Sequence, residues 1–77
     1  MATHPRITRD PKVLAGKPVI KGTRISVEFI LERLAANWND SEILENYPQL
    51  GREDILACLA FAHDVVAENS AVPSAAE

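Results

Sequence analysis

A group of cations in the first third of this 77-residue chain is the feature best suited to chemistry. Its members are Arg6, Arg9, Lys17, Lys21 and Arg24. Arg and Lys side chains bind phosphates and carboxylates through charge-assisted hydrogen bonds. The group therefore predicts a surface that binds an anion, either the backbone of a nucleic acid or carboxylates of another protein.

The charges of the chain are unevenly distributed. Residues 1–24 contain six Lys or Arg and one acid, whereas residues 25–77 contain two Lys or Arg and ten acids, for a net charge of −3. This asymmetry favours an anion at the basic end and a basic partner or water around the acidic body. The alternative is that the basic end faces the acidic body of the same molecule or of a second copy. In that case Arg24 pairs with a nearby acid such as Glu28.

Residue types that act in catalysis are present, but their spacing does not suit catalysis. Cys58 has no cation within three residues to lower its thiol pKa, and it is predicted to be a core residue. His63 follows it by five residues, which is off the same helix face, and His4 lies near the terminus. The strings GxSxG, HExxH and GxxxxGK[ST] do not occur. We therefore expect a non-enzymatic protein without a cofactor or a metal ion.

A short β-element is predicted to position the cations. Ile7–Arg9 and Val19–Ile20 are β-prone and are expected to pair, with Asp10–Pro11 opening the turn between them. Residues 12–14 are predicted to be a further extended piece. A lone hairpin is marginal in water, so this small sheet must lie on helices or pair across a dimer. Its open edge can accept a strand from another chain.

The string GKPVIKGTRISV, residues 16–27, joins this element to the first helix. Gly16 and Gly22 are predicted to adopt positive φ, which carries no Cβ penalty for glycine. Ser26 is predicted to be the N-cap of a helix over residues 27–36, because apolar residues follow at helical spacing.

Two further helices are predicted. Asn39 and Glu42 form a capping-box pattern that opens a short helix, which Pro48 ends. The last helix is predicted over residues 52–68, and it is apolar without a break over residues 55–62. A helix that is apolar all round is surrounded by protein. One side is expected to pack on the earlier helices, and the other is expected to meet a partner or a second copy. That outer side is predicted from Cys58, Phe61 and Val65.

The predicted fold is mostly α: a three-helix helix-turn-helix (homeodomain-like) core with a short N-terminal β-hairpin element. In this class the second helix of the motif enters the DNA major groove with its first residues on the bases. Here that helix offers Arg52 against four acids, and phosphates repel an acidic helix. DNA binding would therefore depend on the cations of the N-terminal element, with Arg52 as a helix contact.

The string GKPVIKGTRISV, followed by a helical pattern, YPQL and an alanine-rich helix, resembles the family called domain of unknown function 433 over residues 7–66. The resemblance implies a VapB-type antitoxin that binds and neutralises a PIN-like ribonuclease toxin and represses its own operon. It implies that the antitoxin blocks the nuclease by covering its metal-binding carboxylates or by inserting an Arg among them, and either Arg24 or the C-terminal tail is a candidate for this role. Asn37 stands where the family has Gly after the first helix. The alternatives are a stand-alone DNA-binding transcriptional regulator and a structural adaptor dimer.

The chain is predicted to be one domain, residues 1–69, followed by a flexible tail, residues 70–77. So short a chain buries only about 60% of its unfolded surface, so a homodimer is expected to add stability. The sequence contains no run of eighteen apolar residues and no apolar leader, which favours a cytoplasmic location.

Overall fold

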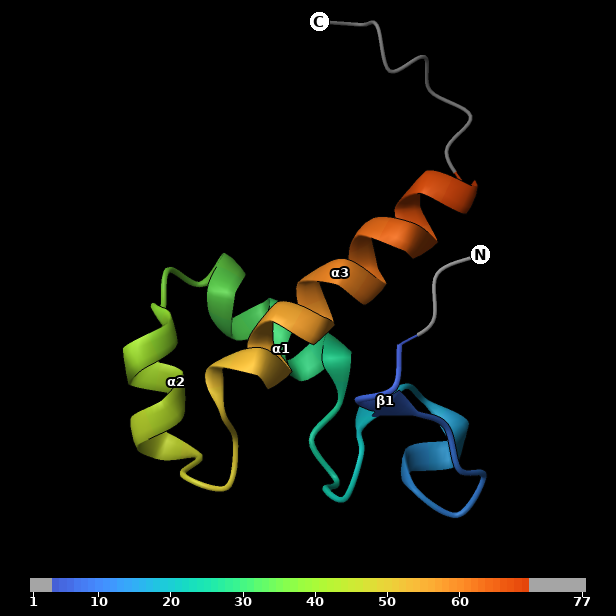
Figure 1. Cartoon of the computed structure of the whole chain (residues 1–77), viewed down its shortest axis with the longest axis horizontal. Coiled ribbons are helices and arrows are strands. Elements are labelled where there is room, and N and C mark those ends of the chain that lie inside the picture. Colours follow the sequence, from blue (N-terminus) through green and yellow to red (C-terminus); the bar gives the residue numbers. More distant parts are fainter. Residues whose placement is uncertain (1–3, 70–77) are drawn as a thin grey trace, which may run out of the picture.

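The computed structural model of the chain describes residues 4–69. Its elements are β1 (Ile7–Thr8), the 3₁₀ turn η1 (Leu14–Gly16), β2 (Val19–Ile20), α1 (Val27–Ala35), α2 (Asp40–Asn46) and α3 (Arg52–Asn69). Figure 1 shows the small hairpin beside the three helices, with α3 running across α1 and its last turns extending past the rest of the fold. The predicted fold class, three helices with a short N-terminal hairpin, is confirmed. The tail predicted at residues 70–77 lies outside the described residues.

The hairpin is built as predicted and is anchored on both sides of β2. Strands β1 and β2 are antiparallel, with Ile7 opposite Ile20. On the other side of β2, the Ile20 N–H donates to the Ile25 carbonyl at 2.9 Å, and Val19 forms a bridge with Ser26. Val19 and Ile20 are buried, so the hairpin lies on the helices through this strand. The outer edge of β1 is the edge that remains open.

Residues 12–14 were predicted to be extended, but only Val13 is, with φ of −117° and ψ of 114° and a β-bridge to Asp10. The Val13 N–H donates to the Asp10 carbonyl at 2.8 Å, and Leu14 and Ala15 have φ of 49° and 56°. Left-handed backbone costs a non-glycine residue about 1 kcal/mol or more. The prediction is wrong at Leu14, because closing the hairpin needs a tight turn there. Gly16 completes this turn with a φ of 83°.

The predicted helix caps are confirmed, and the predicted bounds of the first and last helices differ from the observed ones by one residue at their C-terminal ends. The Ser26 hydroxyl accepts a hydrogen bond from the Phe29 N–H at 2.9 Å, which caps α1. Asn39 and Glu42 form the reciprocal capping box of α2. Asn37, between these helices, has a φ of 74°, the left-handed conformation that ends a helix.

One apolar core joins the hairpin to all three helices. Its buried members are Ile20, Val27, Ile30, Ile43, Leu50, Ile55 and Cys58. Leu50, in the connection between α2 and α3, is buried. Because β2 contributes to the same core as α1 and α3, the cations around β2 are held on a rigid base.

Among residues 4–69, no helix has the length and the apolar composition needed to cross a membrane.

Candidate partner-binding surfaces

Internal ion pairs occupy three of the six cations predicted to contact a partner. The pairs are Arg6 with Asp54 at 3.2 Å, Lys17 with Glu28 at 3.0 Å and Arg52 with Asp40 at 2.7 Å. Each pair joins two segments of the fold, namely the hairpin with α3, the segment before β2 with α1, and α3 with α2. Pairs at the surface contribute about 0–1 kcal/mol each, so their main effect is to neutralise these cations. The alternative pairing of Arg24 with Glu28 is not formed, and the Glu28 carboxylate binds Lys17 instead.

Two cations remain exposed on the turn between β2 and α1. Lys21 and Arg24 flank Gly22, and no carboxylate within residues 4–69 forms an ion pair with either of them. The turn itself is well fixed. The Thr23 hydroxyl donates to the Ile20 carbonyl at 2.8 Å and accepts from the Ile25 N–H at 2.9 Å. We call residues 21–24 the cationic turn.

The predicted φ of the cationic turn is confirmed, since Gly22 has a φ of 82°. A Cβ at this position would meet no atom within 4 Å. Glycine is therefore favoured here by the backbone conformation and not by lack of space. The turn presents its two cations on a backbone that few other residues can adopt.

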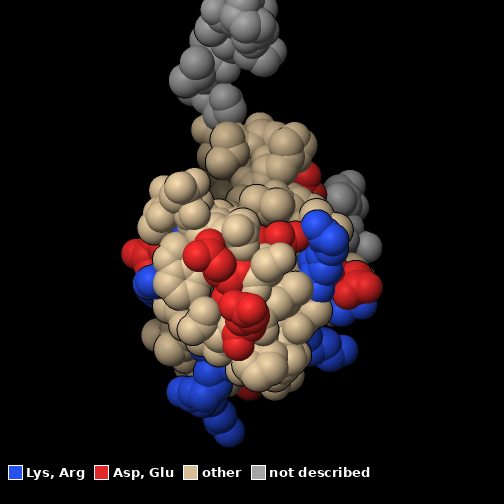
Figure 2. Space-filling model, turned by 90° about the vertical axis from the view of Figure 1, so that its left-hand side faces the viewer, with Lys and Arg blue, Asp and Glu red and all other residues tan. Residues whose placement is uncertain are grey.

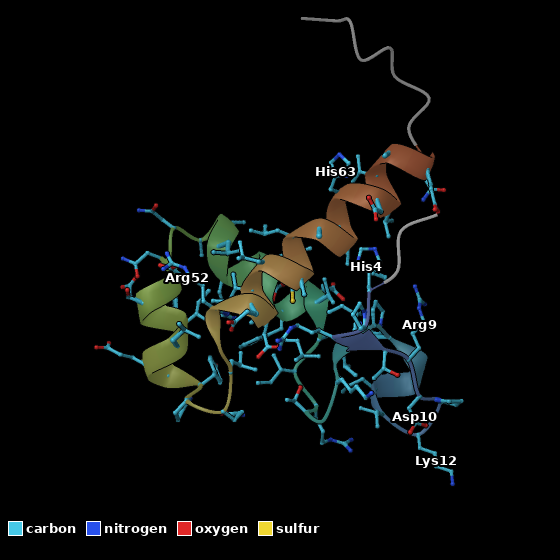
Figure 3. The ribbon with its side chains drawn as sticks, viewed as in Figure 1. His4, Arg9, Asp10, Lys12, Arg52 and His63 are labelled. Atoms are coloured by element: carbon cyan, nitrogen blue, oxygen red, sulfur yellow. The ribbon has the colours of Figure 1, made fainter. Side chains whose placement is uncertain are left out.

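Two further cations lie on the hairpin loop. Figure 3 shows Arg9 and Lys12 at the end of the molecule farthest from α2. The Arg9 guanidinium lies 6.0 Å from the centroid of the Phe61 ring, at the outer limit of a cation–π contact. The Asp10 carboxylate accepts a hydrogen bond from the Lys12 backbone N–H at 2.9 Å. The hairpin end of the fold is therefore basic.

The opposite end of the fold is acidic. In Figure 2, acidic side chains lie at the centre of the face that includes α2, and Lys and Arg lie around its rim. Helix α2 contributes Asp40, Glu42 and Glu45. Arg52, the cation at the start of α3, is bound to Asp40, and Figure 3 shows it beside α2. The start of α3, the second helix of the helix-turn-helix motif, is thus a poor surface for phosphates.

The prediction that Cys58, Phe61 and Val65 form the outer face of α3 is partly wrong. Cys58 is 0% exposed and belongs to the core, so it contacts no partner. Burial, with a smaller contribution from the Asp54 carboxylate, raises the pKa of the Cys58 thiol to about 11. The prediction failed because an unbroken apolar run does not reveal which stripe of the helix faces inward. Phe61 is half-buried, whereas Val65 is exposed.

Phe61 and Val65 do meet at an open hollow between α1 and α3, with a volume of about 320 Å³. We call it the α1–α3 groove. Its lining consists of Lys17, Pro18, Val27, Glu28, Leu31, Phe61, Ala62, Val65 and Val66. The lining is apolar apart from the Lys17–Glu28 ion pair. Sequence reasoning missed Val66, Leu59 and Leu56, which are exposed on α3; their helical spacing is a signal that could have found them.

Sequence reasoning also missed that two histidines bind the same carboxylate, that of Asp64. His4 Nε2 lies 2.8 Å from one oxygen of Asp64, and His63 Nδ1 lies 3.1 Å from the other. Figure 3 shows the two rings on opposite sides of α3. The hydrogen bond with His63, and then that with His4, lowers the pKa of Asp64 below its usual value. Within residues 4–69, no three His, Cys, Asp or Glu side chains are grouped so that they could hold a metal ion.

A family model and a solved structure similar to this chain both point to one family. The family described as "Protein of unknown function (DUF433)" matches residues 7–62. The "Uncharacterized protein y4eO" of Sinorhizobium fredii (strain NBRC 101917 / NGR234) is 34% identical over 56 residues, which are 73% of this chain and 25% of the relative. This chain therefore spans about a quarter of the length of that curated relative. A crystal structure of a DUF433 member from Anabaena variabilis ATCC 29413 aligns with a TM-score of 0.72 at 31% identity, covering 83% of this chain and 59% of that one.

Proposed function

This chain belongs to the DUF433 family, and from that premise we propose that it is a non-enzymatic, antitoxin-like protein that binds and neutralises a PIN-like ribonuclease. One observation carries the proposal. Lys21 and Arg24 are exposed on a fixed turn and unpaired within residues 4–69, whereas Arg6, Lys17 and Arg52 are neutralised inside the fold.

The chemistry of such an inhibition follows from charge. A metal-dependent nuclease gathers carboxylates around its metal ion. Arg24 can form two parallel hydrogen bonds with a carboxylate, and Lys21 can add a point charge beside it. Opposite unit charges 4 Å apart attract by about 4 kcal/mol at an effective dielectric constant of 20. Arg24 would thus compete with the metal ion for its carboxylates.

The rigidity of the cationic turn supports tight binding. Both hydrogen bonds of Thr23 and the positive φ of Gly22 hold the turn before a partner arrives. A binding segment that is already ordered loses less conformational entropy on association. The two cations therefore need only side-chain ordering when they meet the carboxylates.

The second candidate is a DNA-binding regulator, either stand-alone or acting on the operon of the antitoxin itself. The exposed cations Arg9, Lys12, Lys21 and Arg24 favour it, and the acidic residues of α2 oppose it. Salt distinguishes the two candidates. Four phosphate contacts would give a slope of log affinity against log salt concentration of about −3.6.

The test uses the product of the reading frame adjacent to that of this chain, assayed for RNA cleavage with and without the chain. We expect the wild-type chain to co-purify with the nuclease and suppress cleavage, and Arg24→Ala to weaken inhibition by roughly tenfold or more. Arg52→Ala is the matched control, because Arg52 is an exposed arginine that already has an internal partner. A nuclease that neither binds the wild-type chain nor loses activity would refute the proposal.

A further inference from the structure

The first residues that the structure describes form a turn that leads directly into the hairpin. The Ile7 N–H donates a hydrogen bond to the His4 carbonyl at 3.0 Å, which closes a turn with Pro5 at its second position, where proline is favoured. The Arg6 carbonyl accepts a hydrogen bond from the Lys21 N–H at 2.8 Å, so the backbone is held from this residue onward. We call this segment the N-terminal turn. His4 lies at its free end.

The N-terminal turn lies along one face of α3. Asp54, Phe61 and Asp64 share this face, because they follow one another at intervals of seven and three residues. Arg6 binds Asp54 at 3.2 Å, and His4 contacts both Phe61 and Asp64. Figure 3 shows the His4 ring between the start of β1 and α3. The turn is therefore attached to the helix by one arginine and one histidine.

The histidine contact is the one that responds to pH near neutrality. His4 Nε2 lies 2.8 Å from Oδ2 of Asp64, and the ring meets the Phe61 ring edge-on with 5.3 Å between centroids. A histidine side chain changes its charge between about pH 5 and pH 8, whereas arginine stays protonated. A charged ring attracts the carboxylate, and a neutral ring retains only a hydrogen bond to it. Attachment at His4 therefore weakens as the pH rises.

Asp64 remains ionised while the histidines titrate. Its hydrogen bonds with His63 and then with His4 lower the pKa of Asp64 below its ordinary value of 3.8. His63 Nδ1 lies 3.1 Å from the second oxygen of this carboxylate, and the His63 side chain is 78% exposed. Because His63 is the sequence neighbour of Asp64, its contact attaches no second segment to the helix. The two histidines share one acid, but His4 alone of the two joins distant parts of the chain.

The other charged groups around this contact keep their charge over the same range of pH. Arg9, on the hairpin loop, has its guanidinium 6.0 Å from the centroid of the Phe61 ring. Glu68 lies one turn beyond Asp64 on α3 and is exposed. Arginine and glutamate side chains are ionised throughout the range in which histidine titrates. A change from acid to mildly alkaline pH therefore acts on this contact through the histidines.

We propose that His4 and Asp64 form a pH-dependent clasp, which holds the N-terminal turn on α3 while His4 is protonated and loosens as His4 loses its proton. The closed clasp places the charged ring beside a carboxylate, so closing it favours the bound proton. In strong acid the clasp opens again, because Asp64 is then protonated.

Opening of the clasp changes the apolar surface of α3. Phe61 is half-buried, and the His4 ring covers one of its edges. Phe61 also lines the α1–α3 groove. When His4 moves away, that edge of the Phe61 ring becomes accessible and adds apolar surface beside the groove. The clasp thus controls how much apolar surface the protein presents at a given pH.

Nuclear magnetic resonance spectroscopy of the full chain tests the clasp. We expect the cross-relaxation between the His4 and Phe61 rings to weaken by roughly threefold or more between pH 5.5 and pH 8, as the ionic part of the contact is lost. In His4→Gln, the amide at position 4 can donate a hydrogen bond but does not titrate, so its contact with Phe61 should not change over this range. Equal intensities at both pH values in the wild type would overturn the proposal.

His63→Gln is the matched control. It removes the other histidine from the same carboxylate, and we expect the contact between His4 and Phe61 to keep its dependence on pH. Asp64→Asn should weaken that contact at pH 5.5 and abolish the dependence. Circular dichroism checks that each variant is folded. A dependence on pH that disappears in His63→Gln, or that persists in Asp64→Asn, would contradict the clasp.

A neutral apolar dye, Nile red, tests the exposure of Phe61. With the wild-type chain, we expect higher dye fluorescence at pH 8 than at pH 5.5, because dye binding follows accessible apolar surface. His4→Ala should give the higher signal at both pH values. A wild-type signal that does not change with pH would overturn the link between the clasp and the groove. The clasp uses the side chains of neither Lys21 nor Arg24, so these results do not depend on the outcome of the nuclease assay.

Discussion

The cationic turn and the C-terminal half of α3 present two different kinds of surface. The turn is polar, and short-range hydrogen bonds from Thr23 to its neighbours hold it. The α3 surface is apolar, and residues distant in sequence meet there, such as Leu31 and Val65. Salt weakens recognition by exposed charges and leaves apolar contact largely unaffected. Binding to the cationic turn and binding to the α3 surface would therefore respond differently to salt.

The largest expected effect is on the free energy of unfolding, and it comes from a core residue that lies between the cationic turn and α3. Ile20 lies in β2 next to the cationic turn, and it is 2% exposed in the core shared with α1 and α3. We expect Ile20→Ala to lower the free energy of unfolding by about 2–5 kcal/mol, because it leaves a cavity. Denaturant titration measures the change. Val66→Ala, at an exposed site, is the control and should cost well under 1 kcal/mol. Similar losses for both would show that the hairpin is not part of the core.

A smaller effect is expected at the backbone of the cationic turn. Gly22→Ala should destabilise the fold by about 1 kcal/mol, because alanine is strained at a φ of 82° although the site has room for its Cβ. Gly22→Asn should recover part of this loss, since Asn tolerates the left-handed region better. Thermal denaturation compares the three proteins. An alanine variant as stable as the wild type would mean that the turn is not held in this conformation.

The smallest expected effect is a dependence of stability on pH at α3. The pKa of Asp64 is lowered in the folded chain from its ordinary value of 3.8, so folding favours the carboxylate. This contribution is present above pH 3.8 and is lost as the pH falls through the lower pKa of the folded state. Thermal denaturation between pH 6 and pH 2 should show it, and the difference between wild type and Asp64→Asn should shrink on acidification. A constant difference would contradict this role of Asp64.

Local features of the fold were predictable because neighbouring residues determine them. Ser26, Asn39 and Glu42 cap helices through hydrogen bonds that span three residues. Gly22 adopts the predicted positive φ, and so does Gly16. Each of these predictions needed only a short stretch of sequence.

Features that depend on contacts between distant segments of the chain were predicted poorly. Glu28 pairs with Lys17 and not with Arg24, although Arg24 is closer in sequence, because β2 and α1 bring residue 17 beside the helix. Leu14 adopts a left-handed conformation that its own propensity disfavours, since the hairpin must close around it. The packing of separate segments decided both outcomes.

By itself the sequence determined the helices, their caps, the hairpin and the concentration of cations near the N-terminus. Only the tertiary structure decided which cations remain unpaired and which stripe of α3 remains exposed. The physical reason is that charge neutralisation and burial arise between segments far apart in the chain, as between Arg6 and Asp54 or around Cys58. In a helix as evenly apolar as the middle of α3, the spacing of residues does not reveal which stripe the other segments cover.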